Sequence, residues 1–422
     1  MTPESSSTEF PVPMGFYELT PATLVPVIYQ LPEVAGRIGG ASTDWRITEI
    51  SDGNMNAVFR IAGPKASVIA KQALPYIRVI GKSWPFPISR IDYEDRALRE
   101  HGRVAGRYLP QVYAYLPQLG LIVMQDFAPH IIARKAFIAG QYLPHLAADL
   151  GDYLARSLFF TSDFALSMPQ KMALTSQFCD NSVLCETTAD VIFAGPYWAA
   201  PMNRVTSGNE PLAAVFHTDN ALKLAAAEMA EVFRTRAQAL IHGDLHTGSL
   251  MVTATETRVI DPEWAFCGPM GFDIGALLGN LLLACFSQPG HATAGNDRKA
   301  YADWLLQTLT GTWAEFSRNF HAFAAAVPTR APLFDAQTAE LFISRHLAAV
   351  FADSVGFAGA KMIRRIIGIS HVEDFEAIRN VPLRAACEAR ALTAARLLLL
   401  NRTTLTGPDD IVTLVQEVQV RG

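Results

Sequence analysis

The pattern of apolar and polar residues divides the chain near Asp126. Before this position, short runs in which apolar and polar residues alternate predict β-strands, and turns rich in Gly, Pro, Asn and Asp separate them. A charged segment with helical spacing at 91–104 interrupts the series. The predicted strands are 45–50, 57–61, 67–71, 111–115 and 121–124. We therefore expect a small antiparallel sheet in the first part of the chain.

After Asp126 the pattern is typical of helices, because apolar residues recur at steps of three and four. The helical segments expected from this spacing are 146–160, 221–239, 277–285, 301–320 and 341–351. Three short apolar runs, 239–241, 249–252 and 258–260, predict a small group of strands within the helical part. The expected fold class is α+β, with a small sheet lobe followed by a larger, mainly helical lobe.

The same changes of pattern predict the domain organisation. A chain of 422 residues is too long for one ordinary hydrophobic core, so we expect two lobes. Residues 1–26 contain Pro and Ser with little periodicity and are expected to form an N-terminal arm. The expected N-lobe is 27–124, a hinge follows at 125–128, and the expected C-lobe is 129–422.

Composition narrows the classes of protein. Hydrophobic residues make up 50% and charged residues 18% of the sequence, which is typical of a globular chain. The formal net charge of -5 argues against nucleic acid or an anionic membrane as a partner. Five scattered cysteines without a Cys-x-x-Cys pair argue against a disulfide framework and against a zinc site, and they fit a reducing cytoplasm.

Two further observations argue against a membrane location. The first residues lack the basic and apolar regions of a signal peptide. The most apolar stretch, 274–286, is expected to be too short to span a bilayer. Gly275 and Gly279 within it have the spacing found in membrane helix dimers, but we expect them to allow close packing inside a soluble core. The expected location is the cytoplasm.

The strongest chemical signal is the string IHGDLHTGS at 241–249, which places Asp244 in a turn between two predicted strands. A carboxylate in such a turn can orient an acceptor hydroxyl and take its proton, as phosphoryl transfer requires. A second signal follows at 261–263, where Asp261, Pro262 and Glu263 come directly after a predicted strand.

Asp261 and Glu263 are two residues apart, so in an extended segment they would face the same side and address one cleft. Carboxylates are the ligands that Mg²⁺ prefers, and it shares them with ATP phosphates. Each motif alone is also compatible with a solvated polar loop or an acidic turn. Their order, with one short hairpin between them, favours an ATP-dependent phosphotransferase.

These motifs resemble a known family. The sequence HGDLH at 242–246 is the catalytic-loop signature of the aminoglycoside phosphotransferase and choline kinase superfamily, which shares the protein-kinase fold. The longer string at 242–249, with DPE at 261–263 and GPMGFD at 268–273, is similar to the 5-methylthioribose kinase family. Further matches to that family are DGNMN at 52–56, KQALPY at 71–76, SWP at 83–85, GFAG at 356–359 and IRR at 363–365.

The resemblance implies a bilobal protein-kinase-like fold and a homodimer. It also implies ATP-dependent phosphorylation of S-methyl-5-thio-D-ribose at its anomeric hydroxyl, a step of methionine salvage. The sequence departs from the family at Gln125, where Glu is more usual, and in the loop around Trp84, where Lys82 replaces a usual Glu. Backbone contacts at Gln125 would survive that change. Because the Trp84 loop is expected to border the sugar, the changes in that loop bear on substrate detail.

The resemblance also implies a nucleotide-binding set in the N-lobe. Lys71 would contact the α- and β-phosphates of ATP and pair with a helix carboxylate, for which Glu94 is the best candidate; the alternative is a lysine on a strand surface. Asn56, at the end of the turn that contains Gly53, would contact the nucleotide. The hinge backbone would meet the adenine at Gln125, Asp126 and Phe127.

In the C-lobe, adjacent Arg364 and Arg365 lie on a late helix otherwise made of Met, Ile and Gly. By resemblance they would bind sugar hydroxyls and counter the charge on the γ-phosphoryl group; the alternative is an arginine that extends to solvent. His242 is interpreted as a buried hydrogen-bonding residue and Asp273 as a support of the catalytic loop. Ser249 stands where the wider superfamily has Asn, and Glu263 would take over that magnesium-ligand role.

Two other functions stay open from sequence alone. One is a kinase of the same fold that acts on another small hydroxyl compound, such as a pentose, an amino alcohol or an aminoglycoside. The other is a catalytically silent nucleotide-binding protein, against which the presence of Asp244, Asp261, Glu263 and Lys71 argues. The partners expected are a small sugar substrate, ATP and Mg²⁺.

Overall fold

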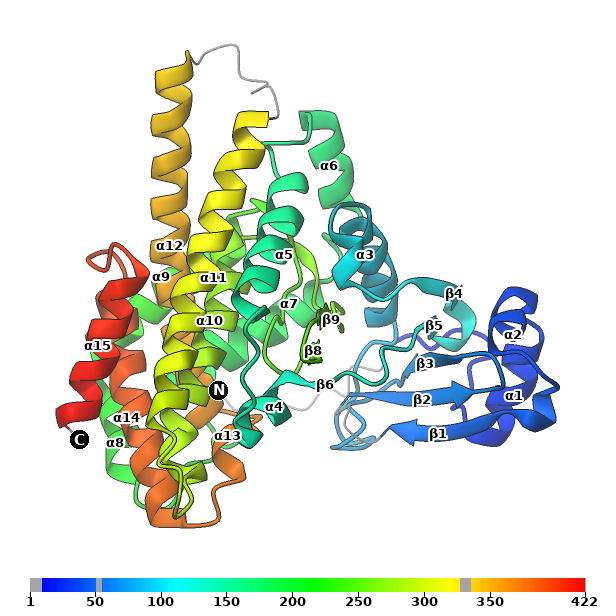
Figure 1. Cartoon of the computed structure of the whole chain (residues 1–422), viewed down its shortest axis with the longest axis horizontal. Coiled ribbons are helices and arrows are strands. Elements are labelled where there is room, and N and C mark those ends of the chain that lie inside the picture. Colours follow the sequence, from blue (N-terminus) through cyan, green and yellow to red (C-terminus); the bar gives the residue numbers. More distant parts are fainter. Residues whose placement is uncertain (1–9, 51–54, 327–334, 422) are drawn as a thin grey trace. The chain divides into compact units, whose positions relative to one another are not determined.

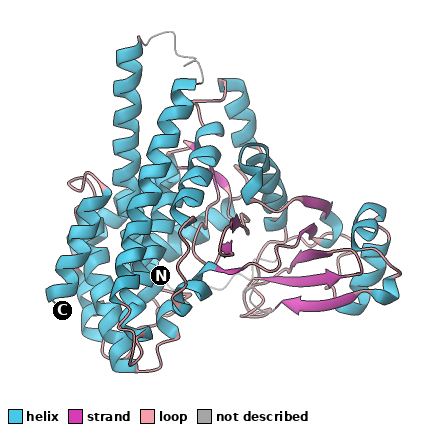
Figure 2. Cartoon of the chain, viewed as in Figure 1, coloured by secondary structure: helices cyan, strands magenta, loops and turns pink. Residues whose placement is uncertain are grey.

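The computed structural model of the chain describes residues 10–50, 55–326 and 335–421, and its contacts divide the chain into two compact units (Figure 1). Unit 1 comprises Met1–Ala128 and Asp261–Trp264, and unit 2 comprises Pro129–Ile260 and Ala265–Gly422. Figure 2 shows that unit 1 holds the larger sheet and that unit 2 is mostly helical, which confirms the expected α+β class. The finer boundaries drawn at residues 26, 124 and 128 stay predictions.

Unit 1 is built on a five-stranded antiparallel sheet in the order β1-β2-β3-β5-β4. Its strands are β1 (Arg46–Ile50), β2 (Asn56–Ala62), β3 (Ser67–Ala73), β4 (Val112–Leu116) and β5 (Leu121–Gln125). Each lies where the alternating pattern predicts a strand. The turn expected at 52–54 lies outside the described residues.

Two helices that the pattern does not predict pack on this sheet. They are α1 (Pro21–Tyr29) and α2 (Pro32–Ile38), and each begins with a proline, which is favourable at the first helical position. Leu24 and Ile28 of α1 are buried in the same core as the sheet residues. Helix α1 therefore lies across the expected end of the N-terminal arm at residue 26.

Helix α3 (Arg90–Ala105) matches the charged segment of helical spacing. Its buried face includes two charged side chains, Arg90 and Glu94, as well as apolar ones. Buried charges need partners, and both of these residues belong to the constellation described in the next section.

Unit 2 contains a set of helices and several short strands, among them the three that the sequence predicts. The strands are β6 (Ile131–Ile132), β7 (Ala239–Ile241), β8 (Leu250–Val252), β9 (Thr257–Val259) and β10 (Phe266–Gly268), paired as β6-β8-β9 and β10-β7. The helices up to the catalytic region are α4 (Ala133–Ala139), α5 (Leu146–Phe160), α6 (Met168–Ser176), α7 (Ser182–Ala189), α8 (Glu210–Thr218) and α9 (Asn220–Thr235). The later helices are α10 (Met270–Ser287), α11 (Lys299–Ala326), α12 (Ala336–Ile366), α13 (Glu373–Glu376), α14 (Val381–Leu400) and α15 (Pro408–Arg421).

Helix α10 is the centre of unit 2 and every residue of it is buried. It packs against α12, and two glycines make the close approach possible. A Cβ on Gly275 would overlap the carbonyl oxygen of Ser354, and one on Gly279 would lie 3.0 Å from that of Ala358. The expectation that Gly275 and Gly279 serve close packing in a core is confirmed.

The length argument used for this apolar stretch is wrong. The helix continues beyond 274–286 at both ends, so Met270–His291 is long and apolar enough to cross a bilayer by length and composition, as is Ala336–Ile366. The apolar window of the first is 100% buried within the chain and that of the second is 56% buried. Full burial, rather than length, is what indicates that α10 is a core helix.

Candidate active site

Asp244 lies on the loop that joins β7 to β8, as the motif predicts. The preceding Gly243 has φ 82°, a left-handed conformation that glycine adopts without strain. The backbone N–H groups of His242 and Gly243 both donate to the carboxylate of Asp273, at 2.6 and 3.0 Å. Asp273 in the first turn of α10 thus holds the start of the catalytic loop in place.

Asp273 and the loop histidine His242 are both buried hydrogen-bonding residues. Burial raises the pKa of Asp273 to about 6, although the two amide donors act in the opposite direction. Nδ1 of His242 accepts from the N–H of Asp244 at 3.3 Å, so we assign the proton to Nε2, which lies 2.9 Å from the carbonyl oxygen of Ile260. This geometry agrees with the supporting roles interpreted from the sequence.

His246 lies beside the Asp244 carboxylate. Its Nδ1 accepts from the N–H of Gly248 at 3.0 Å, and its Nε2 is 3.4 Å from Oδ2 of Asp244. Burial lowers the pKa of His246 to about 4, so the ring is neutral at pH 7. It offers Asp244 an N–H group rather than a positive charge.

Asp244 faces two cationic side chains of helix α12. Nζ of Lys361 donates to Oδ1 of Asp244 at 3.1 Å, and an Nη2 of Arg365 lies 4.0 Å from the same oxygen. Burial alone would raise the pKa of Asp244, but His246, Lys361 and Arg365 outweigh it and hold this pKa well below its usual range. Asp244 is therefore an ionised carboxylate throughout the neutral range.

The expected arginine pair lies in the last turn of α12. Arg365 donates from Nη1 to the carbonyl oxygen of Ser370 at 3.0 Å. Among the described residues, the buried Nε atoms of Arg364 and Arg365 have no hydrogen-bond partner. Burial lowers the pKa of both guanidinium groups, but arginine stays protonated in proteins, so both side chains are cations with a buried, unused Nε donor. Such donors suit a phosphate or sugar oxygen.

Sequence reasoning missed Lys361. It lies three and four positions before Arg364 and Arg365, which places the three on neighbouring parts of one helix face. The available signal was a charged residue inside a long run of apolar and small residues, since such a residue is costly to bury without a partner.

Unit 1 contains a second constellation, built on β3 and α3. Nζ of Lys71 lies 2.7 Å from a carboxylate oxygen of Glu94, and it also pairs with Asp261. Burial raises the pKa of Glu94, and the charge of Lys71 opposes this effect. The ion pair expected between Lys71 and Glu94 is thus present, while its contact with ATP stays a prediction.

Asp261 and Glu263 differ in their surroundings. Asp261 has φ 73°, which is strained for a residue with a side chain, and its side chain is 45% exposed. Glu263 is 4% exposed, and its Oε2 accepts from Nδ2 of Asn56 at 2.9 Å. The argument that both carboxylates face one side of a strand is wrong, because β9 ends at Val259 and residue 261 has a left-handed conformation.

Arg90 organises the buried end of this constellation and was not singled out from the sequence. Its guanidinium donates to Oδ1 of Asn56 at 2.8 Å and to the carbonyl oxygens of Leu74 and Pro87, and its Nε is 3.4 Å from Glu263. Burial lowers the pKa of Arg90, and Glu263 and Glu94 oppose that effect. An arginine in the first turn of a charged helix carries no local signal of such burial.

The three expected hinge residues end β5 and lead out of unit 1. Gln125 is the last residue of β5 and pairs with Val68, and Phe127 is buried. The carboxylate of Asp126 forms an ion pair with Arg60, with 2.6 Å between Oδ2 and Nε. Their backbone contact with adenine stays a prediction.

Comparisons with known proteins agree with this geometry. A model of the phosphotransferase enzyme family matches residues 46–316. Methylthioribose kinase 1 of Oryza sativa subsp. japonica is 44% identical over 95% of this chain and 96% of its own length. Methylthioribose kinase of Escherichia coli O45:K1 is 41% identical over 95% of this chain and 98% of its own length. The chain belongs to the methylthioribose kinase family.

A solved structure of glucosamine kinase in complex with glucosamine, ADP and inorganic phosphate is 14% identical to this member of the methylthioribose kinase family. The superposition covers 89% of this chain and 83% of the glucosamine kinase chain, with a TM-score of 0.46.

Kinases of this family use ATP and a divalent metal, and the carboxylates of unit 1 fit such an ion. Asp261 offers an accessible carboxylate, whose oxygen atoms are of the type that hard cations bind. Glu263 supplies a second carboxylate whose orientation is fixed through Oε2 by Asn56 and Arg90. Lys71 already pairs with Asp261, so a bound ion would share this carboxylate with the ammonium group.

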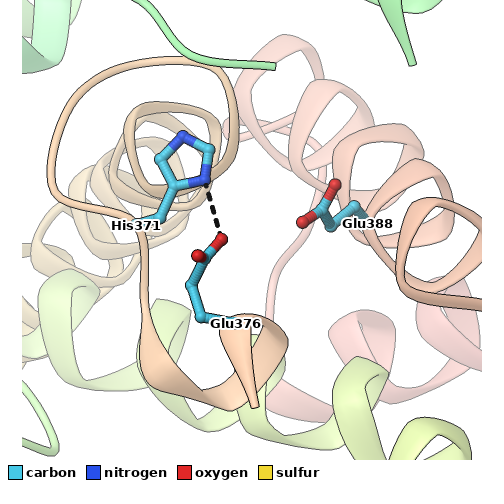
Figure 3. A group of neighbouring side chains, drawn as sticks. All are labelled: His371, Glu376 and Glu388. Carbon is cyan, nitrogen blue, oxygen red and sulfur yellow. Dashed lines mark ion pairs between the residues drawn. The ribbon is translucent and has the colours of Figure 1, made fainter. Parts of the chain in front are cut away.

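A second group of possible metal ligands, His371, Glu376 and Glu388, lies in unit 2 (Figure 3). Its carboxylates already have partners. Glu376 pairs with Arg204 at 3.1 Å and with Arg384 at 3.6 Å. The two oxygens of Glu388 accept hydrogen bonds from side chains of Thr206 and Asn209. This cluster is an ion-pair and hydrogen-bond network, and we assign it no metal.

Proposed function

We propose that this chain transfers the γ-phosphoryl group of ATP to the anomeric hydroxyl of S-methyl-5-thio-D-ribose. The products are ADP and the 1-phosphate, and the step belongs to methionine salvage. The observation that carries the proposal is the ionised Asp244 carboxylate on a loop clamped by Asp273, in a chain whose relatives named methylthioribose kinase cover 95% of it.

Asp244 acts on the sugar. Its carboxylate accepts a hydrogen bond from the anomeric hydroxyl, orients that oxygen toward phosphorus and takes its proton as the new O–P bond forms. A pKa held well below the usual range makes Asp244 a weak base. Its main contribution is therefore orientation, with proton transfer late in the reaction.

Lys71 and the carboxylates of unit 1 act on ATP. Lys71, fixed by Glu94, contacts the α- and β-phosphates, and the backbone of the hinge meets the adenine. Asp261 and Glu263 would hold Mg²⁺, which would neutralise phosphate charge and help to orient the phosphates. Asn56 orients Glu263 and borders the nucleotide.

Arg364 and Arg365 counter the charge that develops during transfer. Their buried Nε donors have no partner among the described residues, which supports a role in binding phosphate or sugar oxygens. A neutral sugar offers them no ion-pair partner, so the γ-phosphoryl group is the better match.

We further propose that the enzyme is a cytoplasmic homodimer that acts on a small sugar and binds neither nucleic acid nor membrane. The net charge of -5 and the full burial of α10 support the part of this proposal that concerns nucleic acid and membrane. Light scattering on the purified chain would show twice the mass of 46.0 kDa. A monomer by the same measurement would contradict the homodimer and leave the reaction untouched.

The experiment that tests the function is ADP release from Mg-ATP by the purified protein, with methylthioribose compared with ribose, choline, homoserine and kanamycin. We expect release that depends on methylthioribose, and a ³¹P spectrum that places the new phosphate on C1. Release with another acceptor would keep the chemistry and replace the substrate. Bound ATP without release on any acceptor would mean that the chain is a nucleotide-binding protein without this activity.

A further inference from the structure

Lys361 is a buried ammonium group that the proposed reaction does not yet use. Only 3% of it is exposed, and its Nζ lies 3.1 Å from Oδ1 of Asp244 and 4.4 Å from the ring centroid of Phe272. All three residues lie in unit 2, and Lys361 reaches the carboxylate from the last third of α12.

Burying an ammonium group is costly, and stability alone does not account for this one. A Met or Leu at position 361 would fill the space against Phe272 without loss of hydration. Lys171 provides a contrast within unit 2, since its buried Nζ donates to the carbonyl oxygens of Thr161 and Gln238 and thereby satisfies backbone groups. The ammonium group of Lys361 donates its hydrogen bond instead to the carboxylate that the reaction needs.

We propose that Lys361 is a positioning residue: its ammonium binds Oδ1 of Asp244, fixes the carboxylate rotamer and directs Asp244 at the acceptor hydroxyl. This inference rests on the proposed function and deepens it. Arg365, at 4.0 Å from the same oxygen and bound to Ser370, is too distant to take over this hydrogen bond.

Lys361 keeps the same protonation state during the phosphoryl transfer. The O–H bond of the sugar breaks as its oxygen forms a bond to phosphorus, and the proton goes to Asp244. The bond between phosphorus and the β,γ-bridging oxygen breaks, and its electron pair leaves on ADP. Lys361 keeps its proton throughout, and its charge stabilises the ionised form of Asp244 before the transfer.

The pKa of Lys361 differs from the pKa values of the groups around it, so its titration can be distinguished from theirs. Burial lowers the pKa of Lys361 to about 8, and the charges of Arg364 and Arg365 on α12 act in the same direction, while Asp244 opposes them. His246 on the catalytic loop has its pKa near 4, and Asp273 on α10 near 6. Arg134 of α4, Arg364 and Arg365 also face this cluster and stay protonated as guanidinium groups. Asp374 of α13 faces Arg365, and burial raises the pKa of its carboxyl.

We therefore expect the kcat of the wild type to fall as the pH rises through about 8, because the neutral amine no longer holds Asp244. K361M, which keeps the length of the apolar stem, should lose about 10²-fold in kcat with smaller changes in KM, and its remaining activity should not fall near pH 8. K361R should recover part of the activity and also lack that fall, since its guanidinium stays charged.

K171M is the matched control, because Lys171 is also buried and burial also lowers its pKa. It should lose stability but keep the wild-type pH profile. A wild-type kcat and pH profile in K361M would overturn the proposal. A fall near pH 8 that persists in K361R would also overturn it, because the titrating group would then be another residue.

A second measurement decides the pairing without catalysis. NMR titration of the chain with ¹⁵N-labelled lysine should show one Nζ, absent from the K361R spectrum, with a pKa near 8. In D244N that pKa should fall further, because the carboxylate that raises it has been removed. An unchanged pKa in D244N would show that the pair does not form. If the wild type releases no ADP with methylthioribose, the proposed function fails, and this titration still confirms or overturns the contact.

Discussion

Lys71 and Glu94 form an ion pair at 2.7 Å in which the side chains are 3% and 0% exposed. The opposite charges of Lys71 and Glu94 compensate for the cost of burying both groups. Lys71 also forms an ion pair with Asp261, which follows it by 190 positions in the sequence. One lysine thereby connects the helix α3 to the proposed metal ligand within unit 1.

Replacing Lys71 should therefore affect stability as well as ATP binding. K71M leaves Glu94 buried without its cation, and we expect the free energy of unfolding to fall by about 3–5 kcal/mol. Urea unfolding measures this change, and calorimetry should show weakened ATP binding. The double variant K71M/E94M should regain most of the stability and none of the ATP binding. A single variant as stable as the wild type would contradict the pairing.

Asp244→Asn removes the base and keeps the shape of the side chain. If Asp244 orients the hydroxyl and takes its proton, kcat should fall by about 10²–10⁴-fold. ADP release at saturating substrate measures this effect, and ATP binding by calorimetry should be nearly unchanged. Turnover close to that of the wild type would exclude Asp244 as the base.

Asp273 should set an acid limit to activity. Below about pH 6 its carboxyl becomes protonated, so it no longer accepts fully from the amides of His242 and Gly243, and the catalytic loop loosens. We expect kcat to fall as the pH drops through about 6. D273N should be less active and should lack this inflection; an inflection that persists in D273N would assign it to another group.

The effect of Asp273 on stability has the opposite sign. Its folded pKa, about 6, lies above the ordinary value of 3.8, so the folded chain holds this proton more tightly than the unfolded chain. The stabilisation from this group is complete below about pH 4 and is lost as the pH rises through about 6, by about 3 kcal/mol. The difference in unfolding free energy between wild type and D273N, followed from pH 4 to 7, tests this sign.

The contact between α10 and α12 predicts which glycines tolerate a side chain. G275A forces a methyl group against the carbonyl oxygen of Ser354 and should destabilise unit 2 by about 1–3 kcal/mol. Gly102 in α3 is the matched control, because nothing lies within 4 Å of an added Cβ there. G102A should stabilise the chain by about 0.4–1 kcal/mol. Thermal unfolding of both variants measures the difference; equal effects would contradict the close packing.

The parts of the fold that were predictable are those in which local pattern and tertiary burial coincide. Strand β1 shows period-two alternation, β4 and β5 are short apolar runs, and α5, α9 and α11 show apolar positions at helical steps. Helix α1 was missed because Pro21 and Pro26 are usually read as breaks, although Pro21 starts the helix and Pro26 lies within it. The length of α10 was underestimated because this fully buried helix lacks polar residues that would mark its ends.

The site shows the same division. Asp244 and Asp261 stand in motifs, so their chemistry can be recognised from sequence. Arg90 and Lys361 have no motif, and their roles depend on partners far away in the chain: Glu263 lies 173 positions after Arg90, and Asp244 lies 117 positions before Lys361. Contacts over such separations follow from the packing of helices, which local patterns do not specify.

The discontinuity of unit 1 has a consequence for the inheritance of this protein. A cut after Ala128 would leave Lys71 and Arg90 on one piece and their partners Asp261 and Glu263 on the other. Exchange of the first 128 residues between distant relatives would thus bring together a lysine and an arginine from one parent with carboxylates from the other. We therefore expect gene segments joined at that point to give a stable chain only when the charges at these positions match.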